Sequence, residues 1–312
     1  MDRFTTDALI FGLALPAGVG MGAAVVAGLL SRCRFGFVSA AFLALAPAGA
    51  FLLSMTLFGW LEYPPKATQD WIVWLGLAAG VAEWLASPLD DVEGGAGPRI
   101  AAFFRCSIAL AVGVAAAWFL LPDFSWAQWL RERPFWLLLV PPLIFALWMS
   151  MMLVFKSGGA LGAGAALTLA AWGGAVAALC VVASNARFGQ EAGVITATVG
   201  GAGVVALLWR RVPYLHLAPA ALAMLGGLAL QSYIHSRTDW NEAPSPHDVP
   251  LVCFLLVLGA PLSAWLFEAP GIRRLPPWAR RLGQALVVLA IAGLGVALGL
   301  LLPEAMPGDE WE

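Results

Sequence analysis

The stretch that decides the fold is SNARFGQEAGVITATVGGAGVVALLWRR, residues 184–211. It opens with a polar cluster, continues as an apolar run with two threonines and several glycines, and closes on Arg210 and Arg211. A helix needs about 20 mainly apolar residues to cross the hydrocarbon core of a bilayer. The stretch therefore predicts a membrane-spanning helix of unusual polarity, whose small residues let neighbouring helices approach closely.

The composition of the whole chain agrees with a membrane protein. Of 312 residues, 61% are hydrophobic and only 12% are charged, whereas soluble domains carry about 25% charged residues. The apolar residues form long blocks, and the alternating ten-residue segments typical of outer-membrane barrels are absent. We therefore predict an all-α, polytopic transmembrane helical bundle, with residues 1–312 forming a single integral membrane domain.

The apolar blocks predict ten spans, because a chain in lipid must satisfy its backbone hydrogen bonds within helices. The predicted spans are 8–30, 35–59, 71–87, 101–121, 135–155, 160–183, 190–209, 213–235, 249–268 and 282–302. The third span is short and contains Glu83, so the sequence leaves open whether it crosses fully. Pro16, Pro47 and the pair Pro141–Pro142 predict kinks.

The ends and the cysteines add two expectations. Residues 8–30 are longer than the apolar region of a signal peptide, so we expect a retained span. The four cysteines are Cys33, Cys106, Cys180 and Cys253, and none belongs to a CxxC pair. We expect them to be buried small hydrophobic residues and not to form disulfides.

Orientation follows from the distribution of lysine and arginine. Of the 17 basic residues, eleven flank the odd-numbered connections between spans and six lie on the other side with the two termini. The positive-inside rule then predicts a plasma-membrane (inner-membrane) protein with both termini non-cytoplasmic. The segment Pro122 to Trp136, around the outer connection 122–134, contains tryptophans and arginines, which predicts a short helix lying in the headgroup region.

The first candidate site joins Glu83 and Arg105. Ionisable residues within a membrane are costly and mark functional sites by default. Glu83 lies four residues before the end of the third span and Arg105 four residues after the start of the fourth, so the side chains can meet near the cytoplasmic face. Two readings stay open, an ion pair that locks the hairpin and a carboxylate that binds a proton or cation.

The second candidate site is the outer mouth of the seventh span, formed by Asn185, Arg187, Gln190 and Glu191. We expect Gln190 and Glu191 in the first turn, where the helix dipole favours a carboxylate. Arg187 can pair with Glu191 or with an anionic ligand. Thr198 comes seven residues after Glu191 on roughly the same face. The readings are a polar substrate path and helix-packing polarity.

Other polar groups predict no site. The outer-loop set of Gln231, His235, Asp239, Glu242, His247 and Asp248 lacks compact metal-ligand spacing, so we expect a solvated loop and not a divalent-cation site. The acidic run Asp90, Asp91 and Glu93 lacks the second acidic pair of a diphosphate–magnesium motif and predicts a flexible loop. We interpret His216 as an interfacial histidine.

Glycine pairs at four-residue spacing predict tight helix contacts. They are Gly18/Gly22, Gly76/Gly80, Gly158/Gly162, Gly189/Gly193 and Gly295/Gly299. No phosphate-binding loop, dinucleotide fingerprint, nucleophile elbow or haem motif occurs, so we assign no catalytic residue, metal or cofactor. The formal charge of −2 and the lack of a basic patch with aromatics argue against nucleic acid.

Three functions are compatible with this pattern, with the lipid bilayer as the expected environment. Ten spans, prolines, glycine-rich helices and intramembrane polar groups favour transport of a small solute or ion. The scarcity of buried charge favours a structural or accessory subunit with a protein partner. A membrane-embedded enzyme acting on lipid-linked substrates is the third reading, and its candidate regions are the connections 122–134 and 236–248.

Overall fold

The computed structural model describes residues 6, 8–33, 35–60, 63–90, 97–121, 127–156, 162–183, 185–209, 214–236 and 248–305. Within these ranges the chain forms helices and turns, and no strand occurs. The prediction of an all-α fold is confirmed.

The long helices follow one another through the whole chain. They are α2 (Leu15–Arg32), α3 (Gly36–Leu57), α4 (Trp71–Ala86), α5 (Gly97–Leu120), α6 (Ala127–Lys156), α7 (Gly162–Val182), α8 (Ala186–Leu208), α9 (Ala218–Ser236), α10 (Leu251–Gly259) and α11 (Pro277–Ala305). Short helices extend or join them, namely η1 (Ile10–Ala14), η2 (Thr68–Asp70), η3 (Ser87–Asp90), η5 (Tyr214–Leu217), η6 (Ala260–Glu268) and η7 (Ile272–Arg274).

Ten helices in the described residues are long and apolar enough to cross a membrane, one at each of the ten predicted positions. The third, whose length the sequence left in doubt, runs over Thr68–Leu89 because the short helices η2 and η3 continue α4 at both ends. At 22 residues it matches the ~20 residues that a bilayer core requires. We therefore describe the chain as a multi-pass membrane protein.

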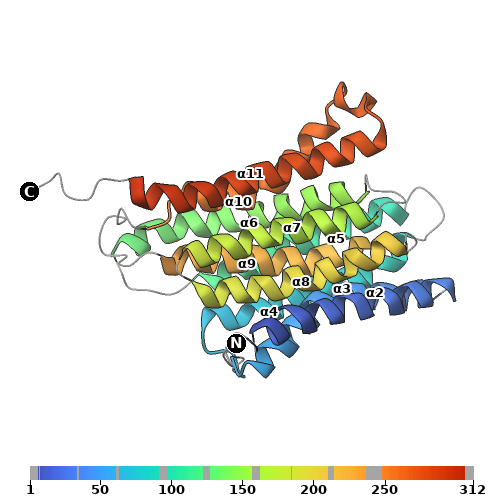
Figure 1. Cartoon of the computed structure of the whole chain (residues 1–312), viewed down its shortest axis with the longest axis horizontal. Coiled ribbons are helices and arrows are strands. Elements are labelled where there is room, and N and C mark those ends of the chain that lie inside the picture. The colour runs from blue at the N-terminus through green and yellow to red at the C-terminus, as the bar shows by residue number, and fades with distance from the viewer. Residues whose placement is uncertain are drawn as a thin grey trace, which may run out of the picture.

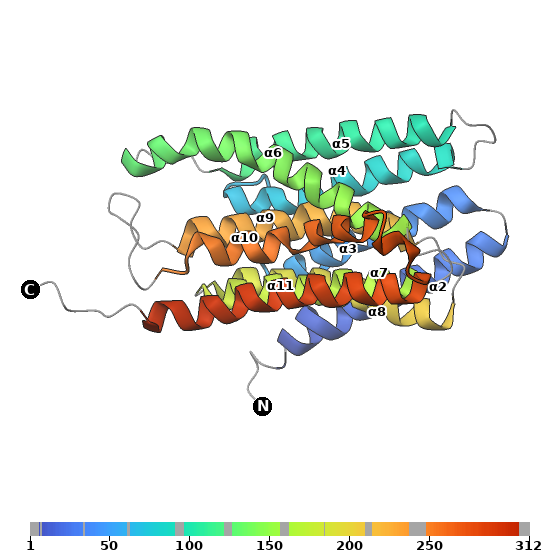
Figure 2. The ribbon, with the colours of Figure 1, turned by 90° about the horizontal axis from the view of Figure 1, so that it is seen from above.

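The helices lie alongside one another with α9 in the middle (Figures 1 and 2). In the span Tyr214–Ser236, all of the most apolar 18-residue window is buried. Helices α3, α4, α5, α6, α7, α8 and α10 all contact α9. Helix α11, by contrast, lies at the edge of the bundle and exposes most of its surface. The core is therefore built around a helix that does not face lipid.

Several glycines sit where one helix backbone touches another. A Cβ atom at Gly20 of α2 would meet the carbonyl oxygen of Thr198 in α8, and one at Gly201 would meet that of Ala17. Of the predicted pairs, Gly80 and Gly295 lie against the backbone of Ala44 and Cys253, whereas Gly76 and Gly299 are crowded by side chains only. Gly18 and Gly22 face open space, and in the pair Gly189/Gly193 only Gly189 is crowded. Gly158 lies outside the described residues, and the surroundings of Gly162 are not described.

The expectation of a separate short helix over Pro122 to Trp136 is wrong for the part that the structure describes. Residues 127–134 belong to α6, which continues through Pro134, Pro141 and Pro142. A proline removes one intrahelical hydrogen bond, and the carbonyl freed near a helix end can be solvated instead. Figure 2 shows α6 bending part-way along its length, as the prolines predict. Residues 122–126 are not described.

Candidate functional site

Glu83 and Arg105 form a buried ion pair between α4 and α5. The Arg105 Nε donates to both carboxylate oxygens of Glu83 at 3.1 and 2.9 Å, and Nη2 donates to Oε1 at 2.7 Å. Glu83 is 1% exposed and Arg105 is 3% exposed. The contact predicted from the hairpin geometry is present, and the two-point geometry is the one that guanidinium and carboxylate groups favour.

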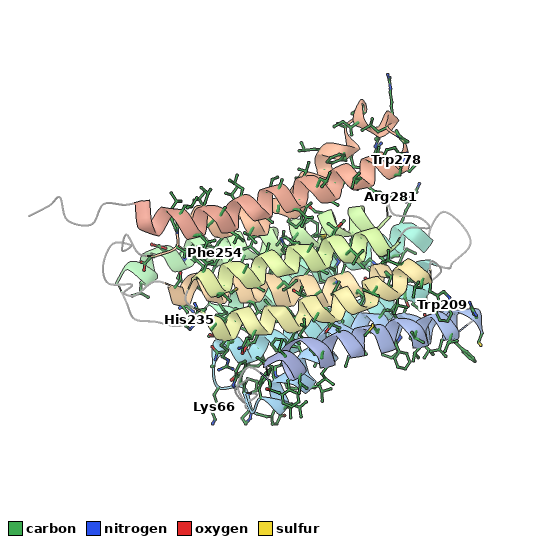
Figure 3. The ribbon with its side chains drawn as sticks, viewed as in Figure 1. Lys66, Trp209, His235, Phe254, Trp278 and Arg281 are labelled. Carbon is green, nitrogen blue, oxygen red and sulfur yellow. The ribbon has the colours of Figure 1, made fainter. Side chains whose placement is uncertain are left out.

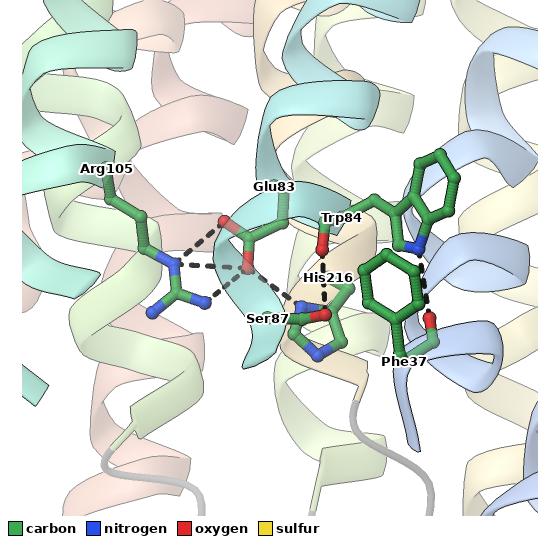
Figure 4. Close-up of polar contacts among 6 residues, drawn as sticks. All are labelled: Phe37, Glu83, Trp84, Ser87, Arg105 and His216. Atoms are coloured by element: carbon green, nitrogen blue, oxygen red, sulfur yellow. Dashed lines mark hydrogen bonds and ion pairs between the residues drawn. The ribbon is translucent and has the colours of Figure 1, made fainter. Parts of the chain in front are cut away.

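His216 is a third member of this cluster. It lies in η5, at the start of the span that contains α9, and its Nδ1 is 2.8 Å from Glu83 Oε1 (Figure 4). A carboxylate accepts hydrogen bonds, so His216 carries a proton on Nδ1 in this arrangement. His216 is buried among the helices and not at their surface, and its depth at the membrane interface stays a prediction. The cluster ties α4, α5 and α9 together at the end of the bundle where α4 ends.

The second cluster lies at the opposite end of the bundle, where α8 begins. Arg187 Nε donates to Glu191 Oε1 at 2.9 Å, one helical turn along α8. The Arg187 Nη2 donates to the Trp60 carbonyl at 3.3 Å, and its guanidinium lies 5.4 Å from the centre of the Trp60 ring. The Arg187 side chain is 38% exposed, whereas that of Glu191 is 3% exposed. Arg187 thus covers a buried carboxylate.

A second carboxylate, Asp70, faces the same place. Its Oδ2 accepts the backbone N–H groups of Lys66 and Ala67, both at 3.0 Å, and this caps the start of the α4 span. A small cavity separates Asp70 from Glu191 and Arg187. It is lined by Phe51, Met55, Trp60, Gln69, Asp70, Val73, Arg187 and Glu191. Its volume of about 10 Å³ is close to what one water molecule needs.

The other residues of the predicted site at the outer mouth, Asn185, Gln190 and Thr198, do not line this cavity. Asn185 donates to the carbonyls of Ala183 and Ser232 and so joins α8 to α9. Gln190 is half-buried. Thr198 is fully buried, and its hydroxyl donates to Val194 of its own helix at 2.8 Å. Thr198 thus lies about 10 Å deeper than Glu191, with its hydroxyl bonded within α8.

The expected dipole interaction of Glu191 is wrong. Helix α8 begins at Ala186, four residues earlier than predicted, and its first turn contains no acidic residue. The sequence reading took the polar residues before Gln190 as a connection. In the structure the Arg187–Glu191 pair lies within the helix, where residues four apart face each other.

The residues predicted to form the outer loop around His235 do not all lie in a loop. Gln231 is not a loop residue: it is fully buried in α9, donates to the Leu120 carbonyl and lies 3.1 Å from the Thr68 hydroxyl. His235 contacts the Gln231 carbonyl within the same helix. Asp239, Glu242 and His247 lie outside the described residues. Among the residues that the structure describes, no group of three His, Cys, Asp or Glu side chains could hold a metal ion.

The four cysteines are free. Cys180 and Cys253 are buried as predicted, but Cys33 is exposed and Cys106 is only partly buried. Cys33 follows the last residue of α2, so it lies outside the apolar interior. The expectation of burial is therefore wrong for Cys33.

The comparisons with known proteins add no functional information. No protein-family model matches the chain, and no curated protein matches it. The proposals below therefore rest on the described geometry.

Proposed function

We propose that this multi-pass membrane protein transports a small ion or solute, and that the cavity between Asp70, Arg187 and Glu191 is where the transported species enters. The observation that carries the proposal is the charge of this cavity. Two carboxylates and one guanidinium line it, which leaves one negative charge uncompensated when all three are ionised. This charge favours a small cation over an anion.

The burial of the two carboxylates strengthens this choice. Glu191 is 2% exposed and Asp70 is 7% exposed, and an unbalanced charge is costly where water is scarce. A proton on Glu191 or a monovalent metal ion would restore neutrality. Carboxylate and amide oxygens, including that of Gln69, are suitable ligands for such hard cations. The cavity volume suits a species about as large as water.

We propose that the Glu83 cluster closes the other end of the transport path. Helix α4 joins the two clusters, with Asp70 preceding its first residue and Glu83 in its last turn. Glu83 Oε1 already contacts both Arg105 and His216. A cation that reached Glu83 would compete with these partners, so we propose that their separation opens this end during transport.

The test is cation flux into liposomes that contain the purified protein. Proton, sodium and potassium gradients are applied in turn, and uptake is followed with ion-sensitive dyes. We expect flux of one cation above protein-free liposomes, a loss of about tenfold or more in Glu191→Gln because the buried charge is removed, and altered rates in Glu83→Gln and Arg187→Ala.

The matched control is Glu132→Gln, which removes a carboxylate near the start of α6, outside the cavity. This variant should transport at the wild-type rate. The proposal would be contradicted by the absence of flux for every cation, or by equal rates in wild type, Glu191→Gln and Arg187→Ala.

A structural or accessory subunit is the second candidate, and one observation favours it. The central helix is wholly enclosed and both candidate clusters contain ion pairs within the protein, so the described structure is complete without a substrate. A stoichiometric protein partner retained in mild detergent, together with absent flux, would establish this alternative. The enzyme reading has no support in the structure, since most of its two candidate regions lies outside the described residues.

A further inference from the structure

The segment from Glu268 to Leu282 extends from one end of the bundle. It connects the span Leu251–Glu268 with the span Pro277–Leu302 and contains η7 and the first turn of α11. Figure 1 shows it projecting beyond the neighbouring helices at the upper right. Because one candidate span ends at Glu268 and the next begins at Pro277, we place the segment and the first turn of α11 at the level of the lipid headgroups. We call residues 268–282 the basic lip.

The composition of the basic lip is unusual for this chain. It carries four arginines, Arg273, Arg274, Arg280 and Arg281, against the single acidic residue Glu268. Trp278 is 65% exposed and Leu275 is 47% exposed among them, and Trp278 and Arg281 are both seen on the projecting part in Figure 3. Aromatic side chains with a polar edge and long cationic side chains favour the boundary between headgroups and acyl chains.

The charges of the basic lip are only partly balanced within the protein. Glu268 Oε2 accepts from Arg273 Nε at 2.9 Å and from Nη2 at 2.7 Å, which uses the only carboxylate of the segment. Arg280 Nε is buried and has no hydrogen-bond partner among the described residues. Arg274 likewise has no carboxylate partner within the part of the chain that the structure describes. Arg280 is partly exposed as a whole residue, so an anion outside the protein can approach its side chain, whose charge has no carboxylate partner among the described residues.

We propose that the basic lip binds the phosphate group of an anionic phospholipid. The depth of the segment places its arginines where headgroup phosphates lie, and guanidinium groups bind phosphate through paired hydrogen bonds. The excess positive charge selects anionic over zwitterionic lipids. Trp278 and Leu275 lie against the glycerol and upper acyl region of the same lipid. The site is independent of the transport proposal, because it lies on different helices from the cavity.

The test measures lipid retention by native mass spectrometry of the full-length protein released from mixed phosphatidylglycerol and phosphatidylcholine micelles. Wild type should retain phosphatidylglycerol preferentially. In the variant Arg274→Gln/Arg280→Gln, the preference for phosphatidylglycerol over phosphatidylcholine should fall about tenfold, since each surface arginine contributes to anionic-lipid binding. The matched control is Arg32→Gln/Arg99→Gln, which removes two positive charges at the same end of the bundle and should keep the preference. Inorganic phosphate in excess should not displace the lipid.

Three results would overturn the proposal. The first is equal retention of phosphatidylglycerol by wild type and Arg274→Gln/Arg280→Gln. The second is the same loss of preference in the control variant, which would indicate that the overall charge of this end, and not the basic lip, selects the lipid. The third is equal binding of phosphatidylcholine, or displacement by inorganic phosphate or by an acidic protein. Thermal unfolding in lipid-free detergent verifies folding, and we expect unchanged midpoints because Arg274 is exposed and Arg280 is partly exposed.

Discussion

Single residues near one end of the bundle show how a membrane protein keeps charge in its interior. Glu83, Arg105 and His216 come from three different helices, and together they satisfy a carboxylate and a guanidinium away from water. Removing one partner of a buried pair leaves the other charge unpaired, which is more harmful than removing both. The cluster therefore holds its helices together only while it is complete.

The stability of the protein should follow this rule. We expect Arg105→Gln to lower the free energy of unfolding by about 3–5 kcal/mol, because Glu83 is left buried and uncompensated. The double variant Glu83→Gln/Arg105→Gln should lose clearly less. Thermal or denaturant unfolding in detergent measures both. Equal losses in the single and double variants would show that the unpaired charge of Glu83 is not the cause of the lost stability.

At this scale the sequence predicted part of the first cluster. The Glu83–Arg105 contact followed from two residues at equal depth in an antiparallel hairpin. His216 was missed because it lies more than 100 residues along the chain. Yet its place near the start of a span, at the same bundle end as Glu83, was a usable signal, since ionisable groups at equal depth require partners. Asp70 was missed because capping residues before a span resemble ordinary loop residues.

Among the elements, α2 and α8 approach each other closely through small residues. Gly20 lies directly against the backbone of Thr198, and Gly201 lies directly against that of Ala17. Such close packing maximises van der Waals contact where lipid offers no hydrophobic driving force. The sequence predicted close approach for the glycine-rich stretch 184–211, but not which glycines face a helix.

Alanine substitutions separate the two kinds of glycine. We expect Gly20→Ala and Gly201→Ala to lower the unfolding midpoint, because the added methyl group would push α2 and α8 apart. Gly22→Ala and Gly193→Ala meet nothing within 4 Å, so they should be neutral or stabilising by up to about 1 kcal/mol, the helix propensity difference. Equal effects in all four variants would contradict the assigned interface.

For the whole molecule, ten spans place Ile10 and Leu302, where the first span begins and the last one ends, at the same end of the bundle. Hydropathy was sufficient to predict all ten positions, because span length is set by the bilayer. The boundaries differed where a polar sequence continued a helix, as at Ala186 and Ala127. Which face is cytoplasmic stays a prediction from charge alone.

The exposed thiol of Cys33 tests this orientation without a tag. It lies in the first connection, which the positive-inside rule places in the cytoplasm. A membrane-impermeant maleimide should label inside-out vesicles and not intact cells, and Cys33→Ser should abolish that labelling. In this background Tyr63→Cys, at a position 80% exposed on the opposite face, should label from outside. Labelling of Cys33 in intact cells would invert the orientation.

The enclosure of α9 has a consequence for biogenesis. The side chains and backbone of the span Tyr214–Ser236, which contains α9, use Thr68, Glu83, Leu120 and Asn185 as partners, and all four leave the ribosome before this span does. A helix with this many polar groups would enter lipid reluctantly by itself, but here its neighbours are already in place when it emerges. We therefore expect the order of synthesis to let the translocon release α9 directly between helices that have already been inserted.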